Sequence, residues 1–298
     1  LTIPQFITVI QSTPVSTLWG TYMMGVLWGI GGLTYGLGIR YLGMSLGNSV
    51  TLGFCAIFGA LIPTLYYNLF PQPGKMALSM MLNTQGGQLI LLGVLVCTVG
   101  IAVCGKAGML KEKDQSDHQT GVQQSEFNVM RGLIVASVSG ILSSCFNFGI
   151  EYGKPMAEEA VRLGFNPLFQ NNVTYVVLLW GGITTNLIWC VCLNWRNKSF
   201  EDYTNQKSPL LKNYTLAALA GTTWYLQFFF YGMGESKLGN GASSWILHMA
   251  FIILISNIWG IVLKEWKGVK TKTLVSILIG ILTIIASVVV VGYGNTLL

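Results

Sequence analysis

The chain contains eight apolar stretches that are each long enough to cross a bilayer as a helix, and this feature limits its possible folds most. A membrane-crossing helix needs about 20 apolar residues, and these stretches lack the strict alternation of a membrane β-barrel. Only 9% of the residues are charged, whereas soluble domains carry about 25%. We therefore predict an all-α, polytopic transmembrane helix bundle. The predicted spans cover residues 15–38, 45–69, 88–105, 130–150, 173–193, 214–233, 242–263 and 273–291.

Basic residues are distributed unequally between the connections on the two sides of this predicted bundle. Of the 17 Lys and Arg residues, one side holds only Lys75, Lys154, Arg162 and Lys237. Cytoplasmic loops carry the excess of Lys and Arg, so the other side is predicted to be cytoplasmic and both chain ends to face outward. The net charge of +6 then reflects topology. We expect the lipid bilayer as a partner and no nucleic acid, and the oligomeric state stays open.

A short internal repeat indicates two related halves. Leu46-Gly47-Asn48 recurs as Leu238-Gly239-Asn240, each between two predicted spans. The repeat relates spans one to three to spans six to eight, so the halves have opposite orientations, as in many secondary transporters. This predicts an inverted five-plus-five repeat with eight of ten helices present. The expected divisions are residues 1–14 as the tail of a missing helix, 15–106 as the last three helices of the N-terminal half, 107–128 as a cytoplasmic loop and 129–298 as the C-terminal half.

The sixth predicted span carries polar and aromatic side chains on one helical face. Trp224, Gln227, Phe228 and Tyr231 follow the spacing i, i+3, i+4 and i+7, which places them on the same side of a helix. Such a face offers a polar solute both hydrogen bonds and aromatic surface. A Gln side chain facing lipid would be costly, so we predict that this face binds substrate. The alternative is helix packing, with Gln227 in an interhelical hydrogen bond.

The seventh span places His248 and Trp245 on one face. The ordinary pKa of a histidine side chain is about 6.5, and an ionisable group within a span suggests a function. His248 therefore has two alternative roles of equal weight: proton coupling, or plain hydrogen bonding by the neutral side chain. Trp245 is predicted to contact the substrate.

Two further spans contribute candidate site residues. A polar stripe on the fourth span ends with Asn147 and Glu151. Asn147 is predicted to bind substrate, and Glu151 either takes up the proton at the cavity mouth or is a solvated interfacial carboxylate. Tyr35 shares a face of the first span with Trp28 and is a further substrate-binding candidate.

An enzyme is not expected. The sequence has no paired acidic motif and no nucleophile–base constellation, and its six cysteines have the spacing of neither a zinc site nor a disulfide framework. We predict no metal and no cofactor.

Several segments, in order along the chain, resemble the L-rhamnose–proton symporter family of the drug/metabolite transporter superfamily. The string Trp224-Tyr225-Leu226-Gln227-Phe228-Phe229-Phe230-Tyr231 is highly specific. Glu151 and Glu235-Ser236-Lys237 depart from the pattern of the enteric members. The other matching segments are residues 28–45, 91–96, 126–128, 154–156, 244–249 and 262–266.

The resemblance implies ten helices in two inverted halves. It also implies a multi-pass protein of the bacterial inner membrane, with a periplasmic C-terminus, that imports L-rhamnose or a close 6-deoxy sugar by proton symport and alternating access. Sodium is not excluded as the coupling ion. The alternative function is export or exchange of another small metabolite within the same superfamily.

Overall fold

All eight predicted spans form helices. The computed structural model describes residues 5–42, 44–71, 75–116, 129–264 and 266–298, and these contain helices and no strand. The all-α prediction is confirmed. The long helices are α2 (Val15–Leu42), α3 (Met44–Leu69), α5 (Gln85–Ser116), α6 (Val129–Tyr152), α8 (Asn171–Asn197), α9 (Leu210–Leu238), α10 (Gly241–Val262) and α11 (Thr271–Thr296); the short ones are α1 (Phe6–Ser12), α4 (Leu78–Asn83) and α7 (Lys154–Arg162), with 3-10 turns at Pro167–Phe169 and Phe200–Tyr203.

Seven helices in the described part of the chain are long and apolar enough to cross a membrane, which supports the polytopic prediction. The eighth long helix, α9, is less apolar. Its centre carries Gly221, Thr222, Thr223 and Gln227, and polar residues within a membrane protein usually face its interior. Gln227, a candidate for substrate binding, is thus one of the residues that lower the hydropathy of α9.

Helix α5 is longer than the sequence predicted. It continues to Ser116, so the first ten residues of the predicted 107–128 loop are helical, because Lys, Glu and Gln are good helix formers. The rest of that loop, with Glu126-Phe127-Asn128, lies outside the described residues.

Asp114, near the end of α5, fastens this helix to the start of α11. Its Oδ2 accepts hydrogen bonds from the backbone N–H of Lys270 (2.9 Å) and from Oγ1 of Thr273 (2.7 Å), and its Oδ1 lies 3.2 Å from Nζ of Lys270. Asp114 thus caps the N-terminus of another helix, where a negative charge is favourable. The hydrogen bonds from Thr273 and Lys270 hold the pKa of the Asp114 carboxyl below its ordinary value.

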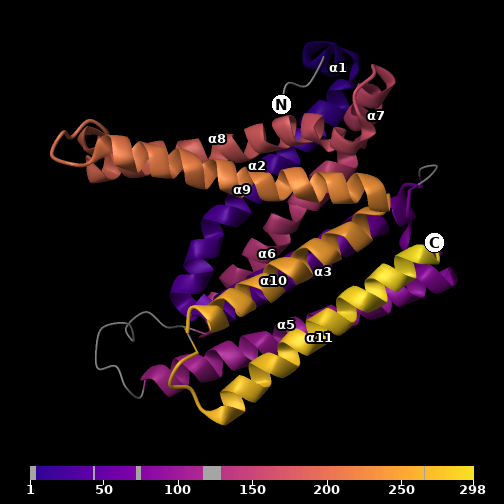
Figure 1. Ribbon diagram of the computed structural model, residues 1–298. Coiled ribbons are helices and arrows are strands. Elements are labelled where there is room, and N and C mark those ends of the chain that lie inside the picture. The colour runs from indigo at the N-terminus through magenta and orange to yellow at the C-terminus, as the bar shows by residue number, and fades with distance from the viewer. Residues whose placement is uncertain (1–4, 43, 72–74, 117–128, 265) are drawn as a thin grey trace.

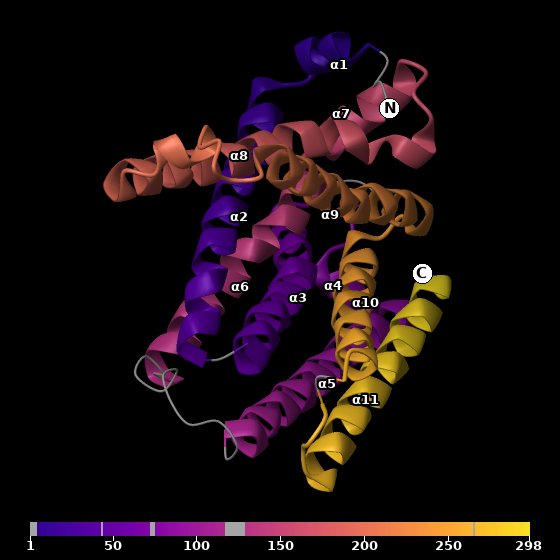
Figure 2. The same ribbon diagram turned by 60° about the vertical axis from the view of Figure 1, so that its left-hand side comes forward.

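The helices are arranged so that α9 lies at the edge of the bundle. Helices α5 and α11 run side by side, α2 packs against α6 and α8, and α3 contacts α5, α6 and α10 (Figures 1 and 2). The end of α2, the end of α5 and the start of α11 lie at one end of the bundle, while α7 and the C-terminus lie at the other (Figure 1). The assignment of these ends to cytoplasm and periplasm stays a prediction.

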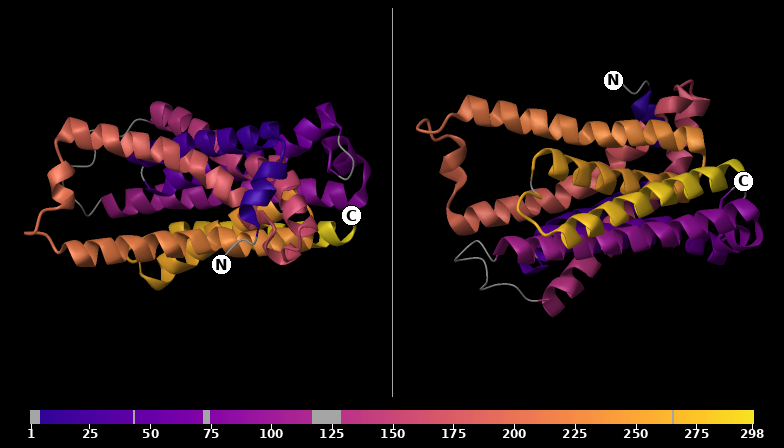
Figure 3. Two further views of the ribbon diagram at one scale, coloured as in Figure 1. Left: turned by 90° about the horizontal axis from the view of Figure 1, so that it is seen from above. Right: turned by 60° about the horizontal axis from the view of Figure 1, so that its bottom comes forward.

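Helices α8 and α9 diverge towards their connection at residues 198–209 (Figure 3). Helix α2 accompanies α8, whereas the first half of α9 has exposed side chains, including Leu211, Leu216 and Leu219. Lipid suits such apolar surface. The divergence leaves one face of α9 open next to the bundle.

Glycines let α2 and α8 approach each other closely. A Cβ atom at Gly25 would lie 1.9 Å from the carbonyl oxygen of Leu178, and one at Gly181 would lie 2.2 Å from the carbonyl oxygen of Tyr22. Small residues at helix contacts are how membrane helices gain close packing. Because the obstacles are backbone atoms, neither side can yield without moving a helix.

The substitution Gly25→Ala should therefore destabilise the protein. We expect about 1–3 kcal/mol of destabilisation from overpacking, seen as a lower thermal unfolding midpoint of the detergent-solubilised protein. Gly32→Ala on the same helix is the control, because nothing lies within 4 Å of its Cβ position. Equal midpoints for both variants would contradict the close α2–α8 contact.

Candidate substrate and proton site

One face of α9 lines a shallow, widely open cleft of about 580 Å³, and all of the residues that line it belong to this helix. Its lining residues recur at helical spacing and include two predicted substrate residues, Trp224 and Gln227. Trp224 is 46% exposed, and Gln227 is half-buried. The cleft therefore offers an amide group beside an aromatic face. The full lining is Leu216, Leu219, Ala220, Thr223, Trp224 and Gln227.

A stacked tryptophan pair connects α9 with α2 beside this cleft. The rings of Trp28 and Trp224 are nearly parallel, with an interplanar angle of 22° and centroids 5.9 Å apart. Phe228 packs edge-on against both, with centroid distances of 6.3 Å to Trp28 and 5.0 Å to Trp224. Phe146 of α6 lies behind them, 4.4 Å from Phe228. Trp28, which the sequence suggested only as a neighbour of Tyr35, belongs to the cluster.

A buried polar pair lies one turn further along α9. The hydroxyl of Tyr231 donates to Oδ1 of Asn147 over 3.1 Å, and Nδ2 of Asn147 donates to the carbonyl oxygen of Gly59 over 2.8 Å. Buried polar groups are normally satisfied in this way. Two predicted substrate residues are thus brought together, and they connect α9, α6 and α3.

His248 lies against Tyr231. The ring centroids are 4.5 Å apart, and Phe228 and Trp245 are 6.5 and 5.9 Å from the imidazole. The ring contacts of His248 are thus with residues that line or support the site.

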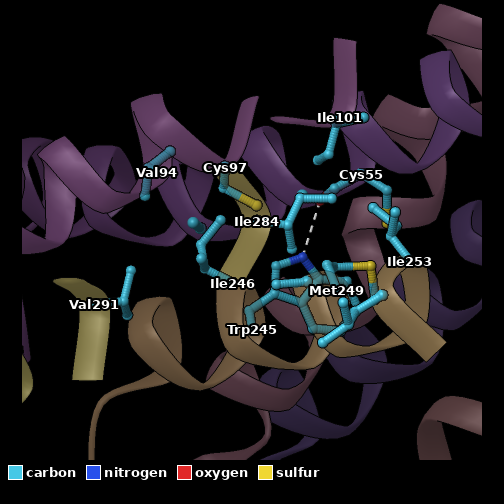
Figure 4. Packing of buried hydrophobic residues seen from close by; sticks show 14 of the residues in the cluster. Cys55, Val94, Cys97, Ile101, Trp245, Ile246, Met249, Ile253, Ile284 and Val291 are labelled. Atoms are coloured by element: carbon cyan, nitrogen blue, oxygen red, sulfur yellow. Dashed lines mark hydrogen bonds between the residues drawn. The ribbon is translucent and has the colours of Figure 1, made fainter. Parts of the chain in front are cut away.

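Trp245 lies deeper than the sequence suggested. Only 2% of its surface is exposed, and its indole N–H donates to the carbonyl oxygen of Cys55 over 2.9 Å. Figure 4 shows this bond among the packed side chains of Met249, Ile246 and Ile253. Trp245 therefore supports the rings of His248 and Tyr231 from the protein core, without facing the cleft.

Tyr35 lies apart from the other candidates. Its hydroxyl donates to Oδ1 of Asn48, which joins α2 to α3. The structure places it two helical turns from Trp28 along α2, and its ring is not among the contacts of the aromatic cluster in the described residues.

Glu151 belongs to a buried ionic cluster at the far end of α9. Its Oε1 lies 2.9 Å from Nζ of Lys154, which also lies 3.2 Å from Oε1 of Glu235, and its Oε2 lies 4.0 Å from Nζ of Lys75. Only 6% of the Glu151 side chain and 3% of the Glu235 side chain are exposed. Glu151 is therefore not a solvated interfacial carboxylate.

Four members of this cluster were not predicted as site residues from the sequence: Lys75, Lys154, Glu235 and Asn171. Nδ2 of Asn171 donates to Oε2 of Glu235 over 2.7 Å and to the carbonyl oxygen of Gly232 over 3.1 Å. One signal was available, because Glu235 follows Tyr231 by four residues and so extends the face of α9 that carries the other candidates.

Along α9 the side chains thus form a continuous series. The open cleft at Gln227 and Trp224 gives way to buried Phe228, then to Tyr231, and finally to the carboxylate of Glu235. Such a face offers hydrogen bonds and ring surface to a neutral polar ligand, and a titratable carboxylate one turn beyond it.

Comparison with known proteins identifies the family. The profile of the family "L-rhamnose-proton symport protein (RhaT)" matches residues 1–296. Proteins named L-rhamnose-proton symporter from Yersinia pestis (strain Pestoides F) and Citrobacter koseri are 38% and 37% identical to this chain, and each alignment covers 99% of the chain and 83% of the relative. No solved structure gives a significant match. The chain therefore belongs to the L-rhamnose-proton symport protein family, as the sequence resemblance predicted.

Proposed function

We propose that the chain imports L-rhamnose, or a close 6-deoxy sugar, by symport with a proton across the bacterial inner membrane. The observation that carries the proposal is the face of α9, where an amide and an indole line an open cleft and a buried carboxylate, Glu235, follows two turns further along the same helix. The family and the names of the relatives, L-rhamnose-proton symporter, supply the substrate and the coupling ion. The proposed topology is multi-pass, with the C-terminus in the periplasm.

In this proposal, Trp224 and Gln227 meet the sugar first. Gln227 has both donors and an acceptor to replace the water around sugar hydroxyls, and Trp224 offers its ring face to the C–H side of the sugar. Phe228, Tyr231 and Asn147 are buried behind the cleft, and His248 lies against Tyr231.

Transport then requires alternating access. Secondary transporters rock two bundles about a site near the midplane, and here the Trp28–Trp224 contact would open and close between α2 and α9. The bound proton must favour one conformation over the other, because a ligand with equal affinity for both shifts nothing.

Labelled L-rhamnose uptake tests the proposal. We expect the protein to restore uptake in a bacterial strain that lacks its own rhamnose transporter, and a protonophore to abolish accumulation above the external concentration. Uptake that ignores the protonophore and follows a sodium gradient would reject proton coupling. Absence of uptake with the protein present in the membrane would favour the export or exchange of another metabolite.

A further inference from the structure

The ionic cluster at the end of α9 holds two carboxylates and two ammonium groups from different parts of the bundle. Glu151, Lys154 and Glu235 come from α6, α7 and α9, whereas Lys75 comes from the connection between α3 and α4. With all four side chains in place, the charges of the cluster balance. Buried charges without a partner are strongly destabilising, so this balance depends on Lys75 staying against Glu151.

Movement of α3 and α4 away from α6 would remove Lys75 and leave two carboxylates sharing Lys154. One excess negative charge would then lie in a buried place, and a proton bound to either carboxylate would neutralise it. A cluster of this kind binds a proton in one conformation and releases it in the other, which is the differential affinity that coupling requires.

Glu151 has ion-pair contacts with two lysines, Lys154 and Lys75, and Glu235 has one with Lys154. Glu151 lies closer to Lys154 than Glu235 does (2.9 against 3.2 Å). Its Oε1 also touches the first residue of α10, because a Cβ at Gly241 would lie 1.9 Å from that oxygen. The N-terminus of a helix favours a negative charge. Both Glu residues lie in the last turns of their own helices. The C-terminus of a helix disfavours a negative charge, and this effect applies to both residues.

Glu235 has neutral partners apart from Lys154. Its Oε2 accepts from the amide of Asn171, the first residue of α8. The hydroxyl of Tyr175 is fully buried, has no hydrogen-bond partner in the described part of the chain, and lies against Gly232, one turn from Glu235. An unsatisfied buried hydroxyl is costly, so it offers a partner to a Glu235 carboxyl that turns away from Lys154. The groups around Glu235 are Lys154, Glu151, Lys75, Asn171, Tyr175 and Tyr231, with Glu158 and Lys237 exposed nearby on α7 and α9.

We infer that Glu235 binds the transported proton, with Lys154 and Glu151 retained as an ion pair and Lys75 as the charge that displaces the proton. The inference rests on the proposed symport. A proton from outside adds to a carboxylate oxygen of Glu235 while Lys75 is withdrawn. The return of Lys75 to Glu151 restores the positive charge, and the proton leaves Glu235 for water on the cytoplasmic side.

The position of Glu235 explains how its protonation affects the sugar site. Glu235 lies one turn from Tyr231 and two turns from Gln227 and Phe228 on the same helix. Its ion pair with Lys154 and its hydrogen bond from Asn171 fasten the end of α9 to α7 and α8. Protonation removes the ion pair, so α9 shifts together with the side chains that meet the sugar.

Infrared difference spectroscopy on the purified full protein, without sugar, tests the proton site directly. Acidification should produce the carbonyl band of a protonated carboxyl group in the wild type. Glu235→Gln should lose this band, while Glu151→Gln and the control Glu159→Gln, whose carboxylate pairs with Arg162 at the surface, should keep it. A band that survives Glu235→Gln, or vanishes in Glu151→Gln alone, would overturn the inference. If Glu235→Gln does not fold, Glu235→Asp must retain the band with a changed titration midpoint; an unchanged midpoint would equally overturn it.

Lys75→Gln tests the role of Lys75. Removing a positive charge from the cluster should move the titration of the band to higher pH by a measurable fraction of a unit or more. Lys237→Gln, which removes an exposed Lys from α9, should leave it nearly unchanged. A shift that is equal in both variants, or downward in Lys75→Gln, contradicts the displacement of the proton by Lys75.

Transport by Glu235→Gln in proteoliposomes completes the test. We expect exchange of labelled for unlabelled rhamnose to continue, while accumulation driven by a proton gradient falls at least about tenfold. Full accumulation would overturn the inference. Absence of rhamnose transport by the wild type would reject the proposed function instead, and the infrared result would still decide whether Glu235 binds a proton.

Discussion

Gln227→Ala should reduce rhamnose uptake roughly tenfold to a hundredfold, while the protein remains in the membrane. Gln227 is the amide that lines the open cleft on α9. Its loss leaves sugar hydroxyls without partners, which costs about 1–3 kcal/mol, and about 1.4 kcal/mol corresponds to a factor of ten. The measurement is the initial rate of labelled rhamnose uptake across a range of sugar concentrations, normalised to the amount of protein in the membrane.

Thr222→Ala is the matched control for this prediction. Thr222 lies on the same helix outside the cleft, and its hydroxyl donates to the carbonyl oxygen of Ala218 over 2.9 Å. Its removal should leave uptake unchanged. Wild-type rates in Gln227→Ala would mean that the α9 face packs against a helix or lipid and does not bind sugar.

His248→Ala should also abolish most uptake. The imidazole lies 4.5 Å from the ring of Tyr231, and its removal opens a cavity behind the Tyr231–Asn147 hydrogen bond. His248 is partly buried, and its truncation removes the ring contact that holds Tyr231 in its place. The expected result is a fall in the maximal uptake rate of at least about tenfold. Normal uptake by this variant would remove His248 from the site.

His248→Gln separates the two roles that the sequence left open. The amide retains hydrogen-bonding capacity and has no titratable proton, so uptake and proton-driven accumulation should largely survive if Glu235 binds the proton. A variant that exchanges rhamnose and fails to accumulate it would assign the proton to His248 and would count against Glu235.

The helices could be predicted because their signal is local. Each span is a run of apolar residues, and lipid admits few other structures for such a run. The end of α5 was placed wrongly because the last turns of this helix are polar and carry no apolar signal. Hydropathy falls at Lys106, whereas the helix continues to Ser116, where Asp114 caps α11. A contact between residues 156 positions apart cannot be recognised in the local sequence of either segment.

The candidate site could be predicted only in part. Trp224, Gln227, Phe228 and Tyr231 share a face that helical spacing alone defines, and the structure brings Asn147 and His248 to the same place. Helical spacing places Trp245 on the same face as His248, yet its indole N–H donates a hydrogen bond to the carbonyl oxygen of Cys55 in the core. Periodicity shows which residues share a face, whereas the depth of each residue depends on the neighbouring helix.

The ionic cluster was the least predictable part. Lys154 and Glu235 are 81 positions apart and meet only because the start of α7 lies next to the end of α9. Considered singly, each is a charged residue at the end of an apolar segment, which usually means an interfacial anchor.

In the stacked pair of Trp28 and Trp224, each indole covers a ring face of the other to which a sugar could otherwise bind. Carbon atoms in contact are about 3.5–4.0 Å apart, so a sugar held between two rings needs far more space than the 5.9 Å between these centroids. On the proposed function, a sugar that binds between these rings displaces an indole that is already bound. An aromatic pair is worth about 0.5–1.5 kcal/mol beyond its buried area, so the measured affinity is the difference between two stacking free energies. A ligand whose apolar face covers the indole poorly would lose this exchange even with every hydroxyl satisfied.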